Sequence, residues 1–113
     1  MKGTPHRTAL ELILSAIPLL REIVAKIRSH DRYLADQLRR AVTSIALNLA
    51  EADGNRDGNR RLRLETAHGS ASEAKYALRI AVAWGYVTQH DIEEAFSIID
   101  RVGAMTWRRL QGR

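Results

Sequence analysis

Hydrophobic residues recur along this chain in steps of three and four, over four segments of about twenty residues each. This spacing stacks side chains on one face of an α-helix. The segments run from about residue 8 to 29, 31 to 52, 60 to 84 and 89 to 110. No stretch sustains the apolar–polar alternation of a half-buried strand. We therefore predict an all-α fold.

The first segment is unusually apolar. One row contains Ile13, Ile17, Leu20, Val24 and Ile27, and a second contains Ala9, Leu12, Ala16, Leu19 and Ile23. The two rows cover about half of the helix circumference, more than the stripe of about 100° typical of a surface helix. We expect one row to face the interior of the fold and the other to require a second partner, which predicts a homo-oligomer.

Turn and capping residues separate the segments. Residues 53–60 read Asp-Gly-Asn-Arg twice, and Asp, Gly and Asn tolerate the backbone conformations that turn a chain. Thr8 with Glu11, and Thr88 with Asp91, have the spacing of a capping box at a helix start. Short turns between long helices favour antiparallel neighbours. We predict a single domain, residues 1–113, folded as an antiparallel up-down four-helix bundle.

The second segment carries a narrow polar row beside its apolar face. The row consists of Gln37, Arg40, Ser44, Asn48 and Glu51, within about 60° on a helical wheel. It has two interpretations, a ligand site or a hydrogen-bonded network that sets the packing between helices or subunits. We favour the network, because buried polar groups with partners commonly specify packing.

The third segment has a seam of mostly small residues. The seam is Leu64, Ala67, Ala71, Ala74, Leu78 and Ala81, and it lets a neighbouring helix approach closely. Gly69 interrupts this helix at a cost of about 1 kcal/mol relative to alanine. Close helix packing is the simplest explanation for that glycine.

The charge balance favours a polyanionic partner. The formal net charge is +5 and the isoelectric point about 10.2, and a positive surface attracts nucleic acid. The candidate phosphate contacts to DNA or RNA are Arg39, Arg40, Arg56, Arg60, Arg61, Lys75 and Arg79. The alternative is a protein-binding scaffold whose charges only keep it in solution.

The sequence contains no pattern that supports catalysis, a cofactor or a metal. The loop from Asp53 to Gly58 matches half of a calcium-binding EF-hand, but Leu64 occupies the position of the required bidentate acid. The four histidines have no metal-ligand spacing. We expect no enzymatic activity and no cofactor. The absence of cysteine, of a membrane-spanning apolar run and of a signal peptide predicts a cytoplasmic protein that does not contact a membrane.

Several blocks together resemble one protein family. They are Gln37-Leu38-Arg39-Arg40-Ala41, Ser44-Ile45, Asn48-Leu49-Ala50-Glu51, Gly69-Ser70 with Glu73, and Gly85-Tyr86. In these blocks the chain resembles bacterial four-helix bundle proteins called 23S rRNA intervening-sequence proteins, whose relatives include the accessory variability determinant of diversity-generating retroelements.

The resemblance implies a homopentameric barrel of bundles. For some members it also implies binding of nucleic acid and of a reverse transcriptase. The chain departs from the family pattern after the second segment, where Ala52 replaces a glycine and Asn55 an arginine, and at Arg63, where a phenylalanine is common.

Overall fold

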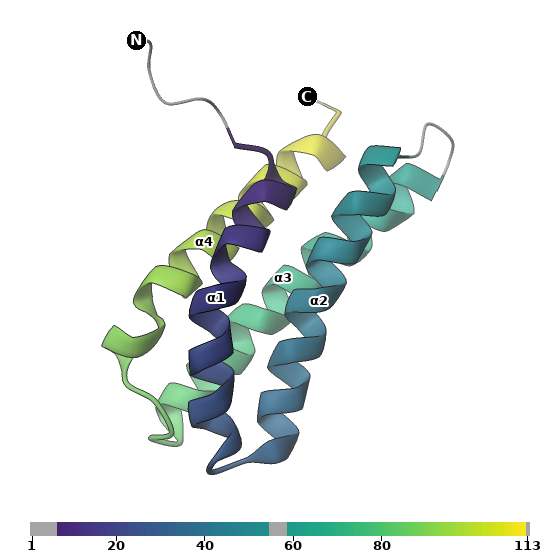
Figure 1. Cartoon of the computed structure of the whole chain (residues 1–113). Helices are drawn as coiled ribbons and strands as arrows, with labels where there is room; N and C mark the ends of the chain where they lie inside the picture. Colours follow the sequence, from purple (N-terminus) through teal and green to yellow (C-terminus); the bar gives the residue numbers. More distant parts are fainter. Residues whose placement is uncertain (1–6, 55–58, 113) are drawn as a thin grey trace, which may run out of the picture.

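The computed structural model describes residues 7–54 and 59–112, which form four helices (Figure 1). Helix α1 spans Ala9–Arg28, α2 Arg32–Gly54, α3 Asn59–Ala83 and α4 Gln89–Leu110. Each helix packs against the next in the chain, and α4 packs against α1, so the bundle closes on itself. The described ranges contain no strand. The predicted all-α, antiparallel four-helix bundle is confirmed.

None of the helices in the described part of the chain is both long and apolar enough to cross a membrane.

The buried apolar side chains of all four helices form one cluster along the bundle axis. Helix α3 contributes mainly alanine to it, as its seam predicts. A Cβ placed on Gly103 of α4 would lie 3.7 Å from the Cβ of Ala71, which is van der Waals contact. Small residues on both helices therefore bring α3 and α4 close together.

The expectation that α1 leaves one apolar row uncovered is wrong. Ile13, Leu20 and Ile27 of one row are buried, and so are Leu12 and Ile23 of the other. Because α1 packs against both α2 and α4, its buried face is wide enough to include members of both rows. Among the row residues only Ile17 is exposed, at 39%.

The prediction that Gly69 allows close packing against another helix of the same bundle is also wrong. Gly69 is exposed, and a Cβ placed there would meet nothing within 4 Å. No helix of the same bundle requires a glycine at this position.

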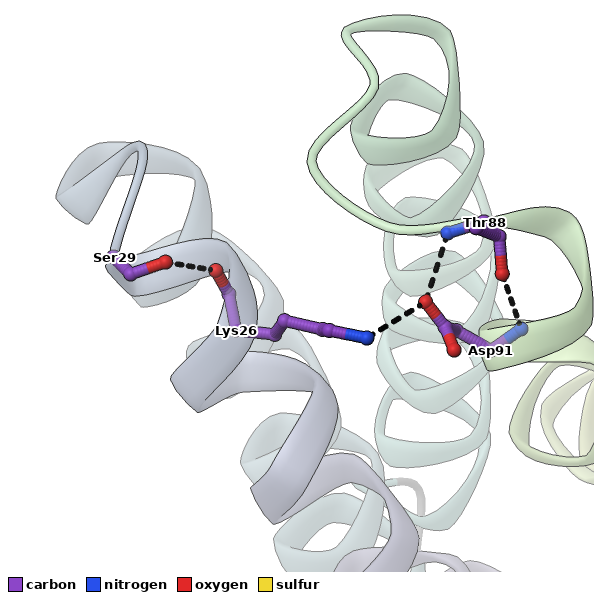
Figure 2. Close-up of polar contacts among 4 residues, drawn as sticks. All are labelled: Lys26, Ser29, Thr88 and Asp91. Carbon is purple, nitrogen blue, oxygen red and sulfur yellow. Dashed lines mark hydrogen bonds and ion pairs between the residues drawn. The ribbon is translucent and has the colours of Figure 1, made fainter.

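Capping residues define the starts of α1 and α4 as predicted, whereas the turn predicted at residues 53–60 lies in part outside the described residues, with α2 continuing to Gly54 and α3 beginning at Asn59. Both capping boxes are formed, at Thr8 and at Thr88. Helix α3 ends at Ala83, and two residues later Gly85 has a φ of 81°, in the left-handed region that glycine adopts readily. The second capping box also ties α4 to α1, because the Lys26 ammonium donates to the same Asp91 oxygen, at 3.1 Å, that accepts from the Thr88 N–H at 2.9 Å (Figure 2).

These contacts favour the ionised form of Asp91. The Thr88 backbone N–H first, and the Lys26 ammonium second, hold the pKa of Asp91 below its ordinary value of 3.8. A carboxyl group with a lowered pKa in the folded state stabilises the fold above the pKa of the unfolded chain, and that contribution is lost as the pH falls through the folded value.

We expect Asp91→Asn to lower the free energy of unfolding modestly at pH 7. The difference from wild type should shrink as the pH falls below 3.8, because the wild-type carboxyl is then protonated as well. Urea denaturation at pH 7 and in the acid range measures this, with Glu94→Gln, an exposed acid of the same helix, as the control. A difference that stays constant across the pH range would contradict the assignment.

Candidate functional site

One flank of α3 carries polar and basic side chains against α4. The contacts are Arg61 Nη1 to Leu110 O at 3.2 Å, His68 Nδ1 to Gly103 O at 3.2 Å and Lys75 Nζ to Asp100 Oδ1 at 2.8 Å. Arg79, one turn beyond Lys75, is exposed. We call the side of α3 that carries Arg61, His68, Lys75 and Arg79 the α3–α4 flank.

Carboxylates offset part of the positive charge on this flank. Lys75 pairs with Asp100, and Arg61 lies 3.3 Å from Glu65 across one helical turn. Exposed pairs of this kind are worth about 0–1 kcal/mol, so phosphate oxygens can compete for the same cations. Arg79 has no ion pair among the described residues.

Sequence reasoning missed Trp107, which lies on the same side of the bundle. Its side chain borders a shallow hollow of about 260 Å³ between α3 and α4, and the residue is 52% exposed. Its ring centroid lies 5.7 Å from that of His68, with the planes 38° apart. An aromatic residue beside consecutive arginines, here Arg108 and Arg109, was the signal in the sequence.

The structure does not gather the seven basic candidates on one surface. Arg39 lines a groove between α1 and α2, which lies across the closed bundle from the α3–α4 flank. Arg40 is exposed one position further along α2, and Arg60 is exposed at the start of α3. Arg56 lies outside the described residues.

Part of the polar row of α2 enters a hydrogen-bonded network with α3. The Ser44 and Ser70 hydroxyls lie 2.8 Å apart, and Asn48 Nδ2 donates to the Ser44 carbonyl at 2.8 Å and to its hydroxyl at 3.1 Å. Arg63 Nη1 donates to Asn48 Oδ1 at 3.4 Å. Four side chains at the α2–α3 contact therefore depend on one another.

The rest of the row stays outside this network in the described part of the chain. Gln37 is half-buried, while Arg40 and Glu51 are exposed. Arg63 was noted in the sequence only as a departure from the family pattern. In the structure the Arg63 Nε is buried and has no hydrogen-bond partner among the described residues. The guanidinium is held in the network through its Nη1, which donates to Asn48.

A second surface is apolar and exposed. It consists of six large side chains, each between 45% and 74% exposed: Tyr33, Leu47, Leu62, Tyr76, Ile80 and Trp84. The three on α3, Leu62, Tyr76 and Ile80, fall within about 40° on a helical wheel, on the side away from the α3–α4 flank, and Trp84 directly follows the end of that helix. The two on α2 border the polar row that meets α3 at Ser44. We call these six residues the α2–α3 face.

The described residues include no group of three or more histidines and acids that could hold a metal ion. The expected absence of a metal site stays a prediction, because part of the loop with the EF-hand resemblance lies outside the described ranges.

Comparison with known proteins identifies the kind of bundle. The model of a family described as 23S rRNA-intervening sequence protein matches residues 8–108. A solved structure from the S23 ribosomal protein family, a protein of unknown function from Bacteroides thetaiotaomicron, superposes with a TM-score of 0.82. It is 17% identical to this chain, and the match covers 91% of this chain and 98% of that one. A search of curated proteins gave no match. Neither similarity indicates a catalytic family.

Proposed function

The chain belongs to the 23S rRNA-intervening sequence protein family, and from this premise we propose that it is a self-assembling, non-enzymatic accessory protein that contacts nucleic acid. Copies of the chain pack through the α2–α3 face, and the α3–α4 flank contacts phosphates without reading sequence. The observation that carries the proposal is the exposure of six large apolar side chains on one face of a small bundle.

Two features of the α2–α3 face support a second copy as its partner. Groups of large exposed apolar side chains usually mark an interaction site, and six lie on this face, although the exposed Arg40 lies between Tyr33 and Leu47 on α2. Gly69 lies on the same side of α3, where it costs about 1 kcal/mol of helix stability, and a Cβ placed on it would contact none of the described residues. Close approach of a helix from another copy at this position accounts for the presence of a glycine there.

A ring requires each subunit to offer two different surfaces. The α2–α3 face is one of them. The groove between α1 and α2, about 710 Å³ in volume and lined in part by Ile17, Leu20, Val24 and Val42, lies on the adjacent side of the bundle and is the second. We propose that the aromatic side chains of one subunit enter this groove of the next. The family resemblance sets the expected number of subunits at five.

The positive charge supports nucleic acid as the ligand of the assembly. Arg60 and Arg79 are exposed, and the net charge is +5. A ring repeats each contact around its axis, so weak phosphate contacts add up to tight binding. The displacement of counterions makes such binding weaken steeply with salt. The second candidate is a protein-binding scaffold, and it is favoured by the carboxylates that already pair with Arg61 and Lys75.

We expect the triple variant Arg61, Lys75, Arg79→Ala to lose about tenfold or more of its affinity for a DNA or RNA strand at low salt. Fewer phosphate contacts also predict a shallower dependence of affinity on salt. Fluorescence anisotropy at two salt concentrations measures both effects.

The matched control is Arg7, Arg32, Arg101→Ala, which removes the same charge from exposed positions away from the flank. Both variants must retain the assembled mass of the wild type. If the wild type binds neither strand at low salt, or if both variants weaken binding equally, the phosphate assignment is wrong and the scaffold replaces it.

A further inference from the structure

The hollow beside Trp107 has features that phosphate binding does not require. Small residues, Ala71, Gly103 and Ala104, supply part of its lining, so no long side chain from these positions fills the hollow. Trp107 is 52% exposed, although burial of an indole is among the largest apolar gains available to a side chain. This residue is therefore open to contact with a flat ligand.

We propose that this hollow receives an unpaired nucleobase, which stacks on Trp107, so that the α3–α4 flank binds single-stranded nucleic acid in preference to duplex. This inference rests on the proposed contact with nucleic acid and names its substrate class. Aromatic side chains beside a basic track are the common means by which proteins hold single strands, because every base has a face that stacks.

The arrangement of the two rings supports this binding mode. The indole of Trp107 and the imidazole of His68 are tilted by 38° with centroids 5.7 Å apart, so they are not stacked flat upon each other. In this binding mode the base lies on the solvent-exposed part of the indole, with the imidazole beside it. A base within a duplex already stacks on its neighbours and must be unstacked to enter a hollow of this kind.

Polar groups at the rim suit the edge of a base. The Gly103 carbonyl can only accept a hydrogen bond, so the His68 Nδ1, 3.2 Å away, is assigned the proton. In the neutral ring this leaves Nε2 as an acceptor. The Ser72 hydroxyl also lines the hollow and can donate or accept. The rim therefore offers hydrogen bonds without demanding one particular base.

Cations continue along α3 on both sides of the hollow. Arg61 precedes His68 by about two turns, and Arg79 follows Lys75 by about one turn. A strand that inserts a base beside Trp107 can therefore place its phosphates near a cation on either side. The flank combines a stacking platform with a basic track on one surface.

The test compares Trp107→Ala and Trp107→Phe with the wild type, using a mixed-sequence single-stranded DNA and its duplex as probes. We expect the wild type to bind the single strand more tightly than the duplex. Trp107→Ala should lose about tenfold or more in affinity for the single strand, as expected for loss of one stacked base, with its salt dependence and duplex affinity unchanged. Trp107→Phe should retain most of the affinity, because a phenyl ring still stacks.

The control is Leu14→Ala, which truncates another large exposed side chain, on α1 and outside both the α3–α4 flank and the α2–α3 face, and should bind as the wild type does. In a Trp84→Phe variant that keeps the assembled mass of the wild type, Trp107 is the sole tryptophan, and the single strand should quench its fluorescence. Wild-type affinity in Trp107→Ala, or equal affinity for both probes, would overturn the stacking inference while leaving the phosphate contacts intact. Failure of the wild type to bind either probe at low salt would overturn both.

Discussion

A variant with Leu47, Tyr76 and Ile80 all replaced by glutamate should be monomeric at micromolar concentrations at which the wild type is assembled. These side chains are exposed on the α2–α3 face, so the substitutions replace no member of the buried core of the single bundle. Assembly would then require the burial of three unpaired carboxylates in each interface, which costs several kcal/mol per charge. Multi-angle light scattering measures the mass, and circular dichroism should show an unchanged helical spectrum.

The matched control adds three carboxylates elsewhere, by Gln89, Ser97 and Gln111→Glu, at exposed positions in and beside α4. This variant should keep the wild-type mass. A wild type that is already monomeric at micromolar concentration, or a face variant that still assembles, would refute the proposed interface.

Asn48→Leu should lower the free energy of unfolding by about 2 kcal/mol. The substitution leaves the Arg63 guanidinium without its acceptor and removes a donor from Ser44. A polar group stranded without its partner in a partly buried site costs about 1–3 kcal/mol. Urea denaturation at fixed protein concentration measures the change, and nucleic-acid affinity should be affected less than stability.

The double variant Asn48→Leu with Arg63→Phe tests whether the loss comes from the stranded guanidinium. Replacing both partners by apolar groups can be nearly neutral, so the double variant should be more stable than Asn48→Leu alone. Gln37→Leu, in the same polar row but outside the hydrogen-bonded network among the described residues, is the control and should change stability by less than about 0.5 kcal/mol. Unaltered stability in Asn48→Leu would show that the network does not support the α2–α3 contact.

The two tests address different levels of organisation. The Asn48 network lies at the contact between α2 and α3 within one chain, while the α2–α3 face lies on their exposed side. The triple glutamate variant of the α2–α3 face should have the mass of a monomer and remain folded. The Asn48→Leu variant should have a lower free energy of unfolding. A result in which both variants unfold would mean that the single bundle is not stable apart from its partners.

Sequence alone was sufficient for the elements of this fold. Helix α3 follows from a seam of small apolar residues in steps of three and four, and α4 from the capping box at Thr88 and Asp91. Such signals act within a few residues of one another, so they are readable along the chain. The same locality explains why the flank that carries Arg61, His68 and Lys75 was recognised as one side of a helix.

Only the tertiary structure decided which sides of the helices meet. Members of both rows of α1 are buried because that helix packs against two neighbours, and no described residue lies within 4 Å of a Cβ placed on Gly69. Arg39 and Lys75 occupy opposite sides of the bundle, while Trp107 of α4 joins His68 of α3 at one hollow. Periodicity sets the angle of a residue about its own helix axis, but the surroundings of that residue depend on how each helix is rotated against the others. That rotation is determined by the packing of all four helices into one core.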